Sequence, residues 1–198
     1  MSDHMLTTGP HRVAESERFD PYLIPAFGFA DRLSRFAWLC AYQLLFRFTP
    51  VPLFRWRAFL LRLFGAKLGP ANYIYPSARI WAPWLLETED CVTVGRSVEL
   101  YNPGGIRLNS HAIVSQGAFL CGASHDYDSP GFEFISAPII VERYAWVCAR
   151  AMVLMGVTVA EGAVLGAGAV AARSLEPWSV YAGNPAVRVK ERKRIVRP

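Results

Sequence analysis

The sequence lacks the patterns that mark several common classes of protein. Its four cysteines include no CxxC pair, so we expect neither a zinc ribbon nor a redox motif at Cys40, Cys91, Cys121 and Cys148. In residues 22–65 the longest run without a charge is eleven residues, whereas a membrane-spanning helix needs about 20. The first twenty residues carry no apolar signal core. We therefore expect residues 1–20 to be disordered or vector-derived, and the thiols to be free in the cytoplasm.

Acidic residues are fewer than basic ones, 16 against 21, and the net charge is +5. Nine basic residues lie between Arg12 and Lys67, and six lie in the last thirteen residues. Such clusters suit the phosphates of a cofactor or of a membrane surface, although they can equally be solvated. Nucleic-acid binding would require basic residues interleaved with exposed aromatics on one platform. The repeat region has no such platform, so we expect no nucleic-acid partner.

Residues 21–67 are expected to form a helical N-terminal segment, broken by the prolines of "TPVP". Arginines recur among its Phe, Trp and Leu residues. One interpretation is a helical cap on the main body or on a neighbouring subunit, which is the usual partner of an apolar helix face. The other is a helix pair in which residues 22–65 contact a membrane surface. The second interpretation would make the protein peripheral to the inner face of the membrane.

Aliphatic residues recur every six positions in the second half of the chain. From residue 141 the repeated positions are Val141, Val147, Val153, Val159, Leu165 and Ala171, and a mostly small residue follows four later, at Ala145, Ala151, Val157, Ala163, Ala169 and Leu175. A helix of 3.6 residues per turn cannot keep this period on one face. The pattern therefore predicts a solenoid of short strands, with one flat side per unit and three units per triangular coil.

The same register extends upstream to Ile74, with slips of two residues near Leu86 and Gly105. We expect about five coils over residues 68–175 and a C-terminal extension over 176–198. The unit that starts at Leu120 is expected to end at His125, and residues 126–140, "DYDSPGFEFISAPII", then break the repeat. A loop that projects from a solenoid is where a functional site is usually built.

Four segments carry a resemblance to a known family: "FLLRLFGAKLG", "IYPSARIWAPWLLE", "VSQGAFLCGASHDY" and "VTVAEGAVLGAGAVAARSLEPWSVYAGNPAVRV". The chain resembles the hexapeptide-repeat acyltransferases, and among them the sugar O-acetyltransferases of the colanic acid biosynthesis type. The resemblance implies a mainly β fold, a left-handed parallel β-helix behind the helical segment, and a homotrimer with active sites between adjacent prisms. It also implies direct transfer of an acetyl group from acetyl-CoA to a saccharide hydroxyl, within exopolysaccharide synthesis. The acceptor would be a free or lipid-linked saccharide.

His125 falls at the catalytic histidine position of this family. Imidazole suits the role of general base, because its ordinary pKa of about 6.5 lies near working pH. Asp126 is a candidate to orient the ring, and Asp128 or a backbone carbonyl is an equal alternative. A backbone amide would hold the oxyanion. Asn102 is a candidate acceptor contact or a simple turn residue before Pro103.

The remaining site predictions also come from the resemblance. Trp146 would line the cleft between subunits. The pantetheine arm of CoA would lie against three small residues, and its phosphates near three basic ones: Ala149, Ala167, Gly168, Arg173, Arg188 and Lys190. From Arg192 onward we expect a solvated tail.

Other functions are compatible with the same architecture. The acceptor could be another small hydroxyl compound such as serine, and the coils could form a non-catalytic assembly module. A zinc carbonic anhydrase of the same architecture needs three histidine ligands. Only His111 and His125 lie in the repeats, so we expect no metal.

Overall fold

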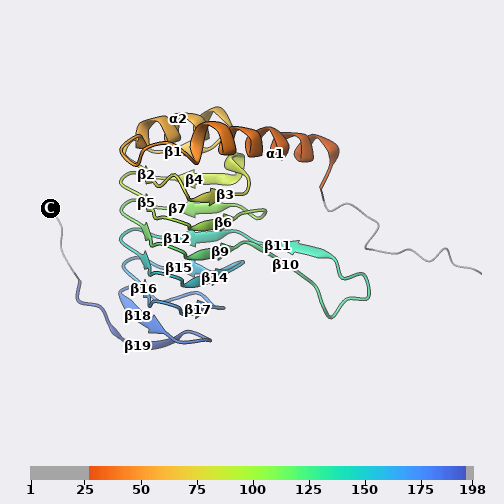
Figure 1. Cartoon of the computed structure of the whole chain (residues 1–198). Helices are drawn as coiled ribbons and strands as arrows, with labels where there is room; N and C mark the ends of the chain where they lie inside the picture. Colours follow the sequence, from red (N-terminus) through yellow and green to blue (C-terminus); the bar gives the residue numbers. More distant parts are fainter. Residues whose placement is uncertain (1–26, 195–198) are drawn as a thin grey trace, which may run out of the picture.

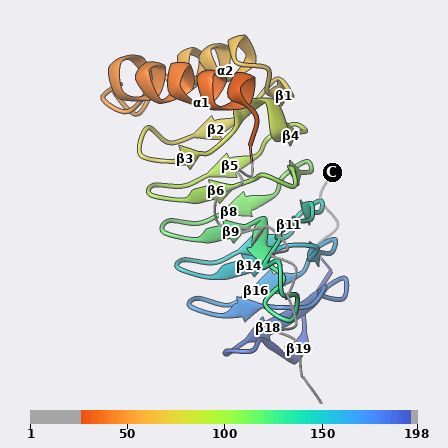
Figure 2. The same cartoon turned by 90° about the vertical axis from the view of Figure 1, so that its right-hand side faces the viewer.

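The computed structural model describes residues 27–194 as a three-sided column of coils with helices across one end (Figures 1 and 2). Our prediction for residues 1–20 lies outside the described residues. The helical end consists of α1 (Phe29–Ala41), the π-helical turn η2 (Tyr42–Phe46) and α2 (Phe54–Leu63), and a 3-10 turn, η3 (Pro83–Leu85), lies in the first coil.

The strands of the coils form three parallel sheets. Sheet A contains β1 (Lys67–Leu68), β4 (Leu86–Thr88), β7 (Ile106–Leu108), β12 (Ile139–Val141) and β15 (Thr158–Val159). Sheet B contains β2 (Tyr73–Ile74), β5 (Thr93–Val94), β8 (Ile113–Val114), β13 (Trp146–Val147), β16 (Val164–Leu165), β18 (Ser179–Ala182) and the antiparallel β19 (Val187–Glu191). Sheet C contains β3 (Arg79–Ile80), β6 (Glu99–Tyr101), β9 (Phe119–Cys121), β14 (Met152–Leu154) and β17 (Val170–Ala171).

The six-residue period is the repeat of this column. In the later coils, paired residues such as Ile140 and Thr158 are eighteen positions apart, which is three units per turn. In the earlier coils the spacing is twenty, as between Thr93 and Ile113. The two extra residues per turn are the predicted slips. At the first of them, both Leu86 and Thr88 of β4 point into the core.

The helices close one end of the core. Trp38, Tyr42 and Phe46 on α1 and η2, with Leu60 and Leu61 on α2, are buried in one cluster with the aliphatic residues of the coils. Burial of these large side chains is the main stabilising term for the cap. A helical segment is expected over residues 21–67, and packing on the column decides which faces of its helices are covered. Among the described residues, no helix has the length and apolarity needed to cross a membrane.

A buried arginine connects the helical end to the first coil. Arg57 of α2 is 0% exposed, and no carboxylate of the described residues pairs with it. Burial lowers the pKa of this guanidinium. Within residues 27–194 its N–H groups donate to four neutral oxygens: Ile74 O (2.7 Å), Thr49 Oγ1 (2.8 Å), Pro50 O (2.9 Å) and Val51 O (2.5 Å).

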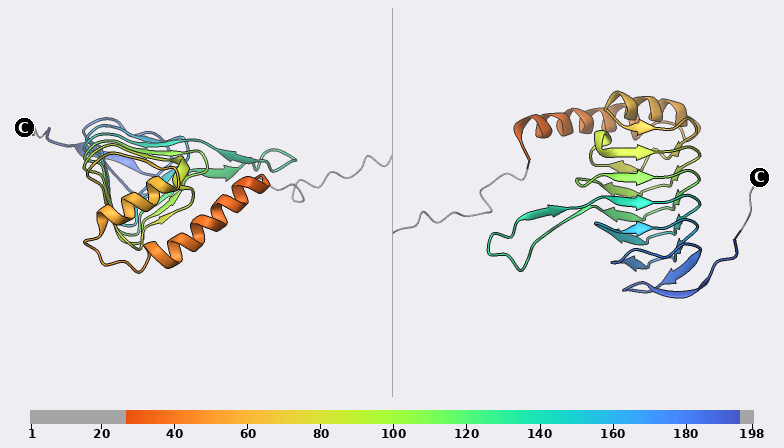
Figure 3. Two further views of the ribbon diagram at one scale, coloured as in Figure 1. Left: turned by 90° about the horizontal axis from the view of Figure 1, so that it is seen from above. Right: turned by 180° about the vertical axis from the view of Figure 1, so that it is seen from behind.

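The predicted loop is a β-hairpin that projects from the corner between sheets C and A (Figure 3). It pairs β10 (Ala123–His125) with β11 (Phe134–Ser136). The chain therefore leaves the coil at Ala123, and the predicted start at residue 126 was too late. The repeat resumes at Ile139, which is buried together with Val141. His125 thus lies on a hairpin strand and does not end a coil unit.

The C-terminal extension also differs from the prediction. Strand β18 pairs with β16 and continues sheet B beyond residue 175, and β19 folds back on β18. Arg192 is not part of a solvated tail, because its Nη1 donates to the carbonyls of Tyr144 and Gly162, both at 2.9 Å. The side chain is thus anchored by backbone carbonyl oxygens at the corners of the coils.

Candidate active site

His125 is held between two aromatic rings of the hairpin. It lies opposite Phe134 in the pairing of β10 with β11. Its ring stacks on Phe132 with centroids 4.6 Å apart at 9°, and meets the edge of Phe134 at 5.7 Å and 80°. The imidazole is nevertheless exposed to solvent. A ring whose plane is fixed while one edge stays accessible is suited to accepting a proton from a ligand.

A backbone carbonyl orients the imidazole. The Nδ1 atom of His125 lies 2.9 Å from the carbonyl oxygen of Phe132. A carbonyl only accepts hydrogen bonds, so Nδ1 must carry the proton, which leaves the Nε2 lone pair free in the neutral ring. This is the alternative in which a carbonyl, and not Asp126, orients the base. The Asp126 carboxylate instead accepts a hydrogen bond from the amide of Asp128 at 3.2 Å, within the turn.

Two glycines let the base of the hairpin sit against the coil above it. A Cβ on Gly104 would lie 2.5 Å from the carbonyl of Ala137, and one on Gly122 would lie 2.8 Å from the carbonyl of Tyr101. The amide of Ala137 donates to Gly122 O at 3.2 Å, and that of Ile139 donates to Gly105 O at 3.1 Å. The hairpin therefore leaves the column in an orientation set by main-chain contacts.

The resemblance makes His125 the expected base of an acyl transfer, so replacement of Gly104 by alanine is expected to lower kcat for that reaction by about 10- to 100-fold. The new methyl group would push Ala137 aside and shift His125, and a displacement of about 1 Å at a reacting group costs about 10² in rate. The measurement is kcat beside the thermal midpoint of each variant. Gly28→Ala is the control, because a Cβ there meets nothing within 4 Å. Wild-type kcat in the Gly104 variant would show that this contact does not position the base.

A cluster of aromatic rings around one arginine joins the hairpin to the first helix. The guanidinium of Arg35 lies 4.5 Å from the ring of Phe27 and 4.6 Å from that of Trp81. Phe27 in turn meets Phe134 with ring centroids 5.2 Å apart. No sequence motif marks these residues as part of a site, although Arg35 and Trp81 are recognisable in the sequence as large side chains. Their proximity depends on the tertiary path of α1.

Asn102 does not face the site. Its side chain is 0% exposed. The Oδ1 atom accepts from the amide of Ala82 at 3.0 Å, and Nδ2 donates to the Ala82 carbonyl at 2.8 Å. With both polar ends used between adjacent coils, the residue bridges two corners of the column, and the turn interpretation is the one that the contacts favour.

Trp146 lies on the outer face of sheet B and is 42% exposed. It pairs in register with Ile113, which is equally exposed, and its indole Nε1 donates to Ser115 Oγ at 2.8 Å. Both residues line a groove of about 250 Å³ together with His111, Tyr144 and Arg192. This exposed apolar surface is separated from the hairpin, because His125 lies at another corner of the column.

The three small residues predicted to contact CoA lie together. Ala149 and Gly168 are in adjacent coils at the corner between sheets B and C, where the amide of Gly168 donates to the Ala149 carbonyl at 3.0 Å. Ala167 is exposed at the same corner. Gly168 has φ +68°, and a Cβ on it would meet nothing within 4 Å. The corner therefore presents open backbone to solvent.

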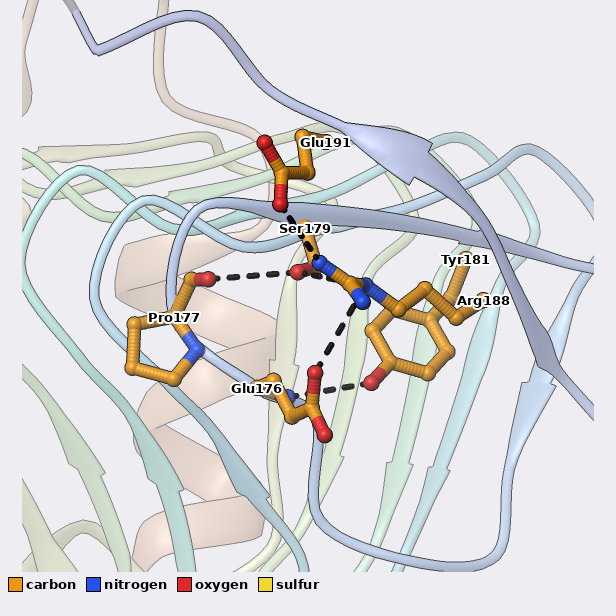
Figure 4. Close-up of polar contacts among 6 residues, drawn as sticks. All are labelled: Glu176, Pro177, Ser179, Tyr181, Arg188 and Glu191. Carbon is orange, nitrogen blue, oxygen red and sulfur yellow. Dashed lines mark hydrogen bonds and ion pairs between the residues drawn. The ribbon is translucent and has the colours of Figure 1, made fainter.

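The three basic residues predicted near the CoA phosphates do not form one cluster: Arg188 and Lys190 both lie on β19, and Arg173 lies elsewhere. Arg173 is exposed in the coil after β17, at the corner between sheets C and A. Lys190 is exposed on β19. Arg188 lies between two carboxylates, 3.5 Å from Glu176 and 3.3 Å from Glu191, and donates to Ser179 Oγ at 3.0 Å (Figure 4). Its positive charge is therefore already paired with these two carboxylates.

Comparison with known proteins identifies the family. Over 155 residues the chain is 41% identical to colanic acid biosynthesis acetyltransferase WcaF of Escherichia coli K12. The aligned segment covers 78% of this chain and 85% of that protein. The chain belongs to the WcaF-type hexapeptide-repeat acetyltransferases. No family model matches the chain. This relationship confirms the resemblance seen in the sequence, and it shows that the chain is an acyltransferase.

Solved structures show that the acetyltransferase shares its fold with other acyl-transferring enzymes. The chain superimposes on maltose O-acetyltransferase of Clostridium difficile 630 with a TM-score of 0.74 at 17% identity, over 84% of this chain and 90% of that one. A hexapeptide-repeat acetyltransferase of Vibrio cholerae, solved with acetyl coenzyme A, gives 0.74 at 20% identity, over 86% and 93%. At these identities the likeness establishes the parallel β-helix with its short helical segment.

The cysteines of the acetyltransferase are poorly placed for covalent catalysis. Burial raises the pKa of the Cys148 thiol, which keeps it protonated. The Sγ of Cys121 donates to the Ala123 carbonyl at 3.4 Å. Among residues 27–194, no three His, Cys, Asp or Glu side chains are grouped so that they could hold a metal ion.

Proposed function

We propose that this acetyltransferase transfers an acetyl group from acetyl-CoA to a hydroxyl of a saccharide in exopolysaccharide synthesis, with His125 as general base. The observation that carries the proposal is the contact between Nδ1 of His125 and the Phe132 carbonyl, at 2.9 Å. It leaves Nε2 as a free base on an exposed hairpin. The saccharide acceptor is supported by the name of the relative at 41% identity, which assigns that protein to colanic acid biosynthesis.

The proposed step is direct transfer. Nε2 of His125 takes the proton of the acceptor hydroxyl as its oxygen attacks the carbonyl carbon of the thioester. The carbon–sulfur bond then breaks, and the imidazolium returns the proton to the departing CoA thiolate. The positive ring would be stabilised by the Phe132 carbonyl through Nδ1–H, because a hydrogen bond from a charged donor is stronger than one from a neutral donor. No acyl-enzyme forms.

We infer a homotrimer, because the proposed site needs two corners of the column. His125 projects from the corner between sheets C and A, while Ala149, Ala167 and Gly168 lie at the corner between sheets B and C. Sheet C separates the two corners within one chain. A neighbouring copy would bring its small-residue corner to the hairpin, and the exposed face with Trp146 would then lie close to the contact between subunits.

The corner at Gly168 fits the pantetheine arm of acetyl-CoA. An extended chain can approach the backbone closely there, because the small side chains leave it uncovered. Arg173 or Lys190 would take the phosphates. Acetyl-CoA is a co-substrate in this proposal.

Replacement of Ala167 by phenylalanine is expected to raise KM for acetyl-CoA by about tenfold or more. The ring would occupy the open corner where we place the pantetheine arm, and its exposed position makes it compatible with the fold. KM for the saccharide is the internal control and should change little. An unaltered KM for acetyl-CoA would remove this corner from the proposed site.

The test of the proposed function is thiol release from acetyl-CoA in the presence of saccharide precursors of bacterial exopolysaccharides, with mass spectrometry of the acetylated product. Serine as acceptor is the control for a transferase of small hydroxyl compounds. Transfer to serine and not to saccharides would favour that alternative. Absence of transfer to either acceptor would favour the non-catalytic assembly module.

A further inference from the structure

Helix α1 is apolar on two opposite sides. One side, with Trp38 buried at 3% exposure, packs on the column. The other side carries Phe29, Leu33 and Phe36, which follow at intervals of four and three and are 76%, 57% and 63% exposed. Leu44, at 78%, extends this stripe into η2. A helix of a soluble domain usually has charged residues on its outer side, so this outer stripe needs another explanation.

The rest of the helical end adds to the same surface. Eleven of the nineteen exposed large apolar residues lie between Phe29 and Leu63. The members outside α1 and Leu44 are Leu45, Phe48, Leu53, Trp56, Phe59 and Leu63. Helices α1 and α2 lie across the end of the column (Figures 1 and 3). We call this exposed apolar surface of Phe29–Leu63 the end face.

The charge of the end face has one sign. Residues 27–65 contain six arginines, of which Arg57 is buried, and a single acidic residue, Asp31, which pairs with Arg35 at 2.8 Å. Arg32 and Arg55 are exposed. A groove of about 420 Å³ beside α1 is lined by three arginines and no acidic residue: Arg35, Arg47 and Arg79. The end face therefore combines apolar side chains with a positive rim.

We propose that the end face docks on an anionic phospholipid bilayer, with its apolar side chains in the interface and its arginines on headgroup phosphates. Helices with an apolar face, aromatic residues and arginines lie in this way, parallel to the membrane plane. A second copy of the chain is a poorer occupant, because face-to-face contact would bring two sets of unpaired arginines together. Binding to the bilayer does not depend on the acetyl transfer proposed above.

Docking would also place the hairpin relative to the bilayer. Phe27, just before α1, contacts Phe134 of the hairpin, and the two ring centroids are 5.2 Å apart. If the proposed function holds, a saccharide carried on a lipid would reach His125 along this side. The docking itself is tested without any acceptor.

The experiment is co-sedimentation of the full chain with vesicles of phosphatidylcholine alone and with vesicles that also contain phosphatidylglycerol. We expect the protein to pellet with the anionic vesicles and to be released by high salt. The variant Leu33→Gln, Phe36→Gln, Leu44→Gln should bind about tenfold or more weakly, since less apolar area enters the interface. Val187→Gln with Val189→Gln, on β19 at the far end, is the matched control and should bind like the wild type.

The positive rim is tested separately. Arg32→Gln with Arg55→Gln should weaken binding to anionic vesicles by about fivefold per arginine. Arg107→Gln with Arg143→Gln, outside the end face, should leave binding unchanged.

Two further measurements distinguish a bilayer from a second copy of the chain as the occupant of the end face. Circular dichroism and size-exclusion chromatography establish that each variant keeps its fold and its assembly. Wild-type protein that stays in the supernatant with anionic vesicles would overturn the proposal. So would binding that the substitutions on the end face leave unchanged, or an assembly that becomes smaller when these residues are replaced, since the end face would then be covered by another copy.

Discussion

Replacement of His125 by alanine is expected to lower kcat for acetyl transfer by about 10²- to 10⁴-fold, which is the usual contribution of a positioned general base. The reason is the pair of contacts that fix its ring, the stack on Phe132 and the hydrogen bond from Nδ1 to the Phe132 carbonyl. Alanine removes the acceptor of the hydroxyl proton and leaves the pairing of β10 with β11 in place. The measurement is thiol release from acetyl-CoA at saturating concentrations of both substrates.

The matched control is His111→Asn. His111 stacks on Tyr144 at another corner of the column, and asparagine tolerates its φ of +62°. This variant should retain kcat. The two proteins should also elute alike in size-exclusion chromatography, which separates loss of catalysis from loss of assembly. An active His125→Ala enzyme would contradict the assignment of the base.

Replacement of Arg57 by methionine is expected to destabilise the fold by about 1–3 kcal/mol, the usual cost of leaving a buried hydrogen-bonding group unsatisfied. Methionine fills much of the volume but leaves the oxygens of Thr49, Pro50, Val51 and Ile74 without their donor. For a chain of this size the thermal midpoint should fall by about 5 °C. The measurement is thermal unfolding at one fixed protein concentration.

Arg55→Met is the control for this stability prediction. Arg55 lies on the same helix but is exposed, and a surface substitution usually changes stability by about 0.5 kcal/mol or less. Equal midpoints for the two variants would show that the hydrogen bonds of Arg57 are replaced by water at no cost. Selective loss in the Arg57 variant would show that the turn between η2 and α2 depends on this side chain.

The repeats were predictable because the six-residue spacing is visible locally in the sequence, and the same spacing sets how successive coils stack. Val147 and Leu165 point inward because every unit presents one aliphatic residue to the same axis, so spacing alone defines the coil. The end of the repeat was predicted less well. Gly122 and Ala123 fit the period, yet the chain turns away there, because main-chain contacts at Gly104 and Gly122 guide the hairpin outward.

The site was predicted in part. His125 is a candidate because of its place beside the interruption and because of the family resemblance, and its role stays a prediction. The group that orients it was left open between a carboxylate and a carbonyl, and Asn102 was left open between acceptor contact and turn. Those questions depend on where side chains point, and Asn102 is buried against Ala82 of the preceding coil. Phe27, Arg35 and Trp81 were missed because they meet only when α1 packs beside the first coil.

The sequence by itself therefore determined the solenoid, its triangular cross-section, the helical segment before it and the histidine at the break, since periodic burial needs no knowledge of distant contacts. Only the tertiary structure decided what orients the imidazole, which of the basic residues are already paired, and that the helices leave an apolar face uncovered. Each of these depends on the meeting of residues that are far apart in the chain, and such meetings follow from packing of whole elements and not from local spacing.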